Sequence, residues 1–207
     1  MHSLAVYCAD IGSVMKDRFG WCGATTPSTK VQGTEINKLA EAVANELKKG
    51  RPVALGFECP LFVPFAVEPT QLASARPGDG NRAWSASAGA TVLVTGLVQV
   101  LWILHELRRL VGDNENTFLD WKAFEARGSG LFLWEAFVSG PRASRTHADD
   151  AKASVESFLD ALPNPLIKNA VRCTSEVYSL IGAALLRSGW ASDLSLLSQP
   201  CLVIKSS

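Results

Sequence analysis

Residues 4–12, which run L-A-V-Y-C-A-D-I-G, are the most informative stretch of this sequence. The residues before Asp10 are almost all apolar, which is typical of a strand that is covered on both faces inside an α/β sheet. The run then ends on the carboxylate of Asp10. A carboxylate at the end of a buried strand costs free energy unless a metal ion, a lysine or backbone N–H groups pair with it. We therefore expect Asp10 to lie at the centre of an acidic pocket at the edge of a sheet.

The composition predicts one domain that spans residues 1–207, with an insertion at about 61–127. Hydrophobic residues make up 47% of the chain and charged residues only 19%, so a large core is available. The formal net charge is zero, and a nucleic-acid contact would therefore need a local basic patch. The oligomeric state stays open at this point.

The five cysteines are widely spaced and form no CxxC pair, which argues against a zinc ribbon or a thioredoxin motif. Most of them lie in apolar stretches of the sequence, where a reduced cysteine acts as a small hydrophobic residue. The N-terminal residues show no basic region followed by an apolar one, so we expect no signal peptide. These features together predict a cytoplasmic protein.

Residues 83–104 carry no charge and are numerous enough to span a bilayer. Polar residues spaced four apart, from Ser87 through Thr91 and Thr95 to Gln99, nevertheless form a stripe along one face of the predicted helix. Because the remaining chain has the pattern of a complete α/β domain, we expect a buried core helix here and no membrane partner.

The order of the elements predicts a mixed sheet flanked by helices. A second strand at residues 18–26 follows the first after a short turn, which implies an antiparallel hairpin, and residues 29–32 suit an edge strand. A helix capped by Thr34 leads to a buried strand at 53–57, and this helical crossover implies that the strands at 4–12 and 53–57 are parallel. Later segments are an apolar strand at 131–138, a helix opened by a capping box at Thr146, a last helix capped by Ser175 and a terminal strand at 201–204.

Three apolar strands each carry one acid: Asp10, Glu58 and Glu135. Ligands of α/β sheets bind at the carboxyl ends of the strands, so these acids are candidates for one catalytic and metal-binding site. Clustered carboxylates repel each other unless a cation is bound, and hard oxygen ligands suit Mg²⁺ or Mn²⁺. Two such ions can activate a water molecule and stabilise the leaving oxygen in phosphodiester cleavage.

The chain resembles the ribonuclease H-like fold and, more narrowly, an uncharacterised family of predicted nucleases with that fold. The residues that carry the resemblance are A-D-I-G with F-G-W at 9–21, G-F-E-C-P-L-F-V-P at 56–64, the segment Arg76…Asp79…Arg82, and L-W-E-A-F at 133–137. The resemblance implies that Asp10 and Glu58 hold two metal ions and that a last helix supplies the final acid. Glu176 is the candidate for that acid, although Ser179 occupies the position that is expected to face the site.

Several of these residues have a second interpretation. Asp10 could accept backbone N–H bonds in its turn, Glu58 could pair with Arg82, and Glu135 could be a satisfied acid of the core. Arg76 and Arg82 either bind phosphate or form structural salt bridges.

At the helix that Thr146 opens, Asp149 is expected to be a cap rather than a ligand. Asp150 and His147 share that helix start and stay outside the predicted ligand set.

The predicted function is that of a metal-dependent nuclease or phosphodiester hydrolase, with nucleic acid or a nucleotide as its partner. One alternative takes D-I-G-S at 10–13 with Lys16 as a phosphate-binding loop, which resembles the first phosphate motif of actin-like ATPases. A second alternative is a non-catalytic binding module on a degraded ribonuclease H-like scaffold, because fold alone does not fix function.

Overall fold

Strand β1 (Ala5–Asp10) lies at the centre of the sheet, and every one of its residues is buried. The computed structural model describes residues 4–25, 29–80, 83–113, 116–138, 146–173 and 176–206. On one side β1 pairs antiparallel with β2 (Gly20–Thr25), which continues into the edge strand β3 (Thr29–Gly33). On its other side β1 pairs parallel with β4 (Val53–Glu58). The predicted hairpin and the predicted parallel pair are both confirmed.

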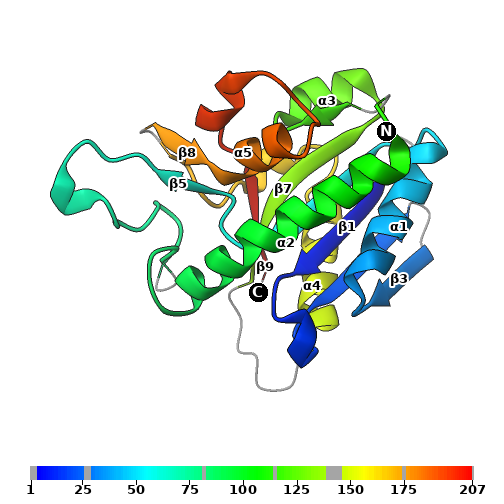
Figure 1. Cartoon of the computed structure of the whole chain (residues 1–207), viewed down its shortest axis with the longest axis horizontal. Coiled ribbons are helices and arrows are strands. Elements are labelled where there is room, and N and C mark those ends of the chain that lie inside the picture. Colours follow the sequence, from blue (N-terminus) through cyan, green and yellow to red (C-terminus); the bar gives the residue numbers. More distant parts are fainter. Residues whose placement is uncertain are drawn as a thin grey trace.

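Among the described residues, seven strands form one mixed sheet with the order β3-β2-β1-β4-β7-β6, and β9 pairs with β7 as well (Figure 1). Strand β7 (Leu131–Val138) is parallel to β4, β6 (Thr117–Phe118) pairs with its first half, and β9 (Leu202–Ser206) pairs with its second half. This sheet confirms the predicted mixed α/β class.

Helices cover both faces of the sheet. The core of one face includes side chains of α1 (Ile36–Lys48), α2 (Ser87–Val111) and α5 (Leu180–Arg187). The core of the other face is formed with α3 (Trp121–Arg127) and α4 (His147–Leu159). Figure 1 shows α1, α2 and α5 in front of the sheet and α4 behind it. Short 3-10 turns complete the described elements: η1 (Val14–Lys16), η2 (Pro69–Gln71), η3 (Pro165–Lys168) and η4 (Leu194–Ser198).

The predicted insertion contains a strand that the sequence did not indicate. Strand β5 (Phe62–Pro64) pairs antiparallel with β8 (Val177–Ser179), which lies more than a hundred residues further along the chain. These two strands form a small second sheet that projects on the left of Figure 1. The pairing of β5 with β8 therefore ties the insertion to the C-terminal part of the chain.

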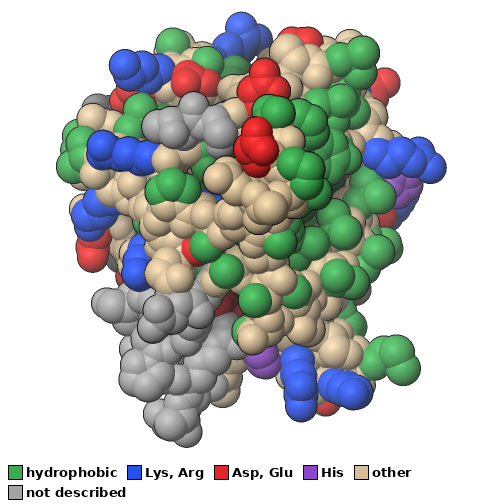
Figure 2. Space-filling view, turned by 90° about the vertical axis from the view of Figure 1, so that its left-hand side faces the viewer, with side chains coloured by type: hydrophobic (Ala, Val, Ile, Leu, Met, Phe, Trp, Pro, Cys, Tyr) green, Lys and Arg blue, Asp and Glu red, His purple; other side chains and the backbone are tan. Residues whose placement is uncertain are grey.

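Helix α2 is long and apolar enough to cross a membrane, and only 28% of its most apolar window is buried. Its second half belongs to the core through Val100, Ile103, Leu104 and Leu107. Its first half exposes large hydrophobic residues, among them Val94, Leu97 and Val98. Hydrophobic side chains gather along the right-hand side of the molecule in Figure 2. The expected buried core helix is thus correct for the second half of α2 and wrong for the first.

Two helix starts differ from the expected ones. The N-cap of α1 is Glu35 rather than Thr34. The last helix begins at Leu180 and is capped by Ser179, whose side chain accepts a hydrogen bond from the Gly182 N–H at 3.1 Å. The strand β8 occupies the place where the sequence predicted the first turn of that helix, because pairing with β5 satisfies its backbone groups instead. The expected cap Ser175 lies outside the described residues.

The register of β4 against β7 places Gly56 opposite Trp134. A Cβ atom on Gly56 would lie 2.4 Å from the Trp134 indole. We therefore expect Gly56→Ala to lower the free energy of unfolding by about 1–3 kcal/mol, because it overpacks the contact. Urea denaturation measures this change, and in a Trp134→Phe background the same substitution should cost less. If the losses in free energy of unfolding caused by Gly56→Ala and Trp134→Phe add within about 0.5 kcal/mol in the double variant, the contact between these residues does not have the structural role assigned to it.

Candidate metal centre

The register of two parallel strands brings the first two acids together. Asp10 on β1 is paired with Glu58 on β4, and each is the last residue of its strand. Side chains of a strand alternate between the two faces. Because Cys8 belongs to the core of the α3 and α4 face, Asp10, two residues later, points to the same side. Ala54 belongs to that core too, so Glu58, four residues later on the same strand, also points to that side.

The third acid comes from the first turn of α4. The capping box predicted at Thr146 is confirmed: its hydroxyl accepts from the Asp149 N–H at 3.2 Å, and the Asp149 carboxylate accepts from the Thr146 N–H at 3.0 Å. With the helix start fixed in this way, the next residue, Asp150, is only 2% exposed. Asp150 thus presents a buried carboxylate from the first turn of α4.

Asp10, Glu58 and Asp150 each offer one oxygen atom, and these atoms lie within 4.8 Å of one another. All three side chains are buried. Three carboxylates at this spacing in a low-dielectric site repel each other, and a bound cation removes that cost. The all-oxygen ligand set fits Mg²⁺ or Mn²⁺ rather than a metal that prefers sulfur. Within the described residues, this cluster could therefore hold a metal ion.

A glycine lets α4 approach the sheet this closely. Gly20 on β2 is paired with Asp10. A Cβ atom there would lie 2.4 Å from both the Ala148 nitrogen and the His147 carbonyl carbon. Since those are backbone atoms at the start of α4, a larger residue at position 20 would displace the turn that carries Asp150.

His147 contacts the cluster directly. Its Nδ1 lies 2.5 Å from the Asp10 Oδ2, and its side chain is 30% exposed. The imidazole therefore bridges the buried Asp10 and the solvent, and it fixes the orientation of that carboxylate. Neither His147 nor Asp150 was among the metal ligands expected from the sequence. The signal that could have found Asp150 is helical spacing, because Asp150, Ser154 and Phe158 recur every four residues on the buried face of α4.

Glu135 lies on the opposite face of the sheet from Asp10 and Glu58. Its neighbours Leu133 and Phe57 belong to the core beneath α1 and α2, so Glu135 points to that side. There its carboxylate accepts hydrogen bonds from the Leu61 N–H at 2.9 Å and from the Arg76 guanidinium at 2.6 and 2.8 Å. The assignment of Glu135 to the metal site is therefore corrected: it is a satisfied acid of the core.

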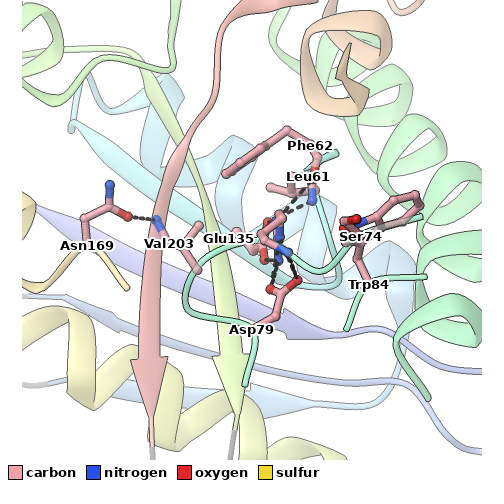
Figure 3. A network of polar contacts seen from close by, with 9 residues as sticks. Leu61, Phe62, Ser74, Asp79, Trp84, Glu135, Asn169 and Val203 are labelled. Atoms are coloured by element: carbon pink, nitrogen blue, oxygen red, sulfur yellow. Dashed lines mark hydrogen bonds and ion pairs between the residues drawn. The ribbon is translucent and has the colours of Figure 1, made fainter. Parts of the chain in front are cut away.

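Arg76 is the partner of two buried carboxylates. Besides its bonds to Glu135, the Arg76 guanidinium donates hydrogen bonds to the Asp79 Oδ1 at 2.9 and 3.0 Å. It also donates one to the Phe62 carbonyl oxygen at 3.1 Å. Figure 3 shows Asp79, Glu135, Leu61 and Phe62 gathered around this network. Burial by itself lowers the pKa of the guanidinium, but the two carboxylates outweigh it and raise that pKa, so the charge is retained. Arg76 was expected to bind substrate, and the structure instead places it in an ion-pair network that is almost completely buried.

Two of the remaining predicted site residues, Lys16 and Glu176, are not members of the acidic cluster. Lys16 is exposed in η1, in the turn after β1. Glu176 is exposed just before β8, where its backbone carbonyl accepts from the Phe65 N–H at 2.8 Å, and it is not part of the acidic group. Arg82 lies outside the described residues. The structure thus unites two predicted ligands, Asp10 and Glu58, with one that was not predicted.

The cysteines nearest to the sheet add no reactive group. Burial raises the pKa of the Cys8, Cys59 and Cys201 thiols well above its usual value. These side chains therefore stay protonated and act as small hydrophobic residues, as the sequence indicated. All five cysteines are free thiols.

We expect Arg76→Met to lower the free energy of unfolding by about 3–5 kcal/mol, because it leaves Asp79 and Glu135 buried without their cation. The matched control is Arg109→Met, which breaks an exposed ion pair with Glu106 on α2 and should change stability little. Urea denaturation of both variants measures the difference. Equal stability losses would show that the Arg76 network is not structural and would return Arg76 to the candidates for substrate binding.

Comparison with protein-family models, with curated proteins and with solved structures gave no match. The function therefore has to be argued from the side chains themselves. They offer three buried carboxylates from β1, β4 and α4 and an imidazole on Asp10. A separate, charge-balanced network lies on the other face of the sheet.

Proposed function

We propose that this chain is a metal-dependent nuclease that hydrolyses phosphodiester bonds, with Mg²⁺ or Mn²⁺ as its cofactor. The observation that carries the proposal is the cluster of Asp10, Glu58 and Asp150, whose oxygen atoms lie within 4.8 Å of one another at the carboxyl ends of two parallel strands. Buried carboxylates from three separate elements at that spacing form a suitable cradle for divalent cations.

The topology supports a ribonuclease H-like fold, which we propose on this basis. Strands β1, β2 and β3 form an antiparallel meander, and β4 and β7 continue the sheet in parallel with β1. Two of the acids follow the pattern that the resemblance implied, since one comes from the first strand and one from its parallel neighbour, whereas the third comes from α4 and not from the last helix. In this proposal Asp150 on α4 takes the role that Glu176 was expected to have.

Each side chain of the cluster has a defined task in the proposed reaction. Asp10 lies between its strand partner Glu58 and His147, so it is the central ligand. Glu58 and Asp150 add oxygen ligands from two further elements. Bound divalent cations would activate a water molecule and neutralise the leaving oxygen of a phosphodiester. His147 orients Asp10 and is exposed enough to exchange protons with solvent.

The proposed partner is nucleic acid, with Lys16 as a candidate phosphate contact. Its exposed side chain belongs to the turn directly after Asp10, which keeps it near the carboxyl ends of the strands. A cytoplasmic location fits the five free thiols, since a reducing compartment keeps cysteines in this state.

Metal binding is the first test. We expect Mn²⁺ to bind the protein and to raise its Tm, as measured by isothermal titration and differential scanning calorimetry. Asp10→Asn and Asp150→Asn should abolish both effects because each removes a charged ligand of the cluster. Glu176→Gln is the matched control, since it neutralises an exposed acid outside the cluster, and it should bind Mn²⁺ like the native chain. Binding that survives both cluster substitutions would refute the assigned site.

Cleavage is the second test. With Mn²⁺ or Mg²⁺ present, we expect hydrolysis of labelled single-stranded or double-stranded DNA or RNA, followed on denaturing gels. Asp150→Asn should lower the rate by about a hundredfold or more, because metal ions supply several kcal/mol of transition-state stabilisation. If Mn²⁺ binds but no nucleic acid is cut, the chain is a binding module. Stabilisation by ATP without cleavage would favour the actin-like interpretation instead.

A further inference from the structure

A cavity of about 210 Å³ opens at the carboxyl ends of β4 and β7, beside the acidic cluster. Glu58 belongs both to the cluster and to the wall of this cavity. The opposite wall is formed by the first turns of α2, through Ala88 and Val92. Glu58 is therefore the residue that joins the cluster to the cavity.

The charges around the cavity do not favour a phosphate inside it. Arg76 lines the cavity, but its guanidinium is already bound by Glu135 and Asp79. With Glu58 and Glu135 also on the wall, the charged residues that line the cavity provide no net positive charge to attract an anion. In the proposed function a phosphodiester is held at the cluster through bound cations, and the cavity beside it then suits an uncharged part of the same molecule.

The size and the lining of the cavity suit a flat, mostly apolar group. Pro60, Val92 and Phe137 contribute apolar surface to the walls. A volume of 210 Å³ is below the roughly 300–1,000 Å³ of pockets that take drug-sized ligands, so a group of about one aromatic ring system fits. We propose that this cavity receives one unpaired nucleobase of the nucleic acid whose adjacent phosphodiester lies at the cluster.

The first turn of α2, which lines the cavity, contains N–H groups that are candidate hydrogen-bond donors to the polar edge of such a base. Ala88 and Gly89 lie in the first turn of α2, where backbone N–H groups have no acceptor within the helix. The N-cap is Ala86, which has no side-chain acceptor to satisfy them. Carbonyl or ring-nitrogen acceptors of a base can bind these N–H groups while its faces contact Val92 and Phe137, as in pockets that hold a base removed from its stack.

This inference rests on the proposed nuclease function, and its test separates the two. The native protein with Mn²⁺ is titrated by calorimetry with AMP, CMP, GMP and UMP, and with ribose 5-phosphate as the probe that lacks a base. We expect at least one nucleotide to bind about tenfold tighter than ribose 5-phosphate, the size of effect that base stacking supplies. If no nucleotide binds tighter than ribose 5-phosphate, the base pocket is refuted, even when Mn²⁺ binds and nucleic acid is cut.

Two variants on one helix locate the effect. Val92→Phe fills the cavity and should reduce the preference for the nucleotide to within about twofold. Val98→Phe is the matched control, because Val98 is 65% exposed on another face of α2, and it should keep the native preference. Ala88→Leu, at an exposed position of the cavity wall, repeats the test if Val92→Phe does not fold. If neither cavity variant changes the preference for a nucleotide over ribose 5-phosphate, the base binds elsewhere and the inference is overturned. If the native chain shows that preference but neither binds Mn²⁺ nor cleaves nucleic acid, the base pocket is supported and the nuclease function is refuted.

Discussion

The parallel, in-register pairing of β1 with β4 is the constraint on which the proposed site depends. It places the Asp10 and Glu58 carboxylates beside each other at the end of two fully buried strands. Carboxylates this close repel each other when both are ionised, and the neighbouring elements add a third one beside them. Gly20 lets α4 approach, the capping box at Thr146 fixes where α4 begins, and Asp150 then completes a cluster of oxygen ligands.

Two groups of buried acids lie on opposite faces of the sheet, so they do not share a cation. On the α4 side, Asp10, Glu58 and Asp150 gather their carboxylates in one place. On the α2 side, Glu135 and Asp79 share the guanidinium of Arg76. The second group is charge-balanced and attaches the start of the insertion to β7 through hydrogen bonds to Leu61 and Phe62. The insertion thereby acquires a fixed position next to the proposed site.

That fixed position gives the insertion a role in the proposed function. The chain leaves β4 at Glu58, forms β5, and returns as α2, whose first turns lie across the carboxyl ends of β4 and β7. Arg76 is already paired with Glu135 and Asp79, so its charge in the cavity wall is not available to bind a phosphate. A cavity with no net positive charge and partly apolar walls therefore lies next to an acidic cluster, which is the arrangement that the proposed base and phosphodiester need.

The sequence by itself determined the buried strands with their hairpin and parallel pairing, the cap of α4, and the acids at positions 10 and 58. All of these features follow from local patterns of apolar, small and capping residues. It did not determine the face to which Glu135 points. A strand buried on both faces shows no alternation of apolar and polar residues, so its register is hidden until its neighbours are placed. The pairing of β5 with β8 and the approach of Asp150 to Asp10 are likewise contacts between distant segments. Only the tertiary structure could decide them, because packing between elements, and not local propensity, fixes such contacts.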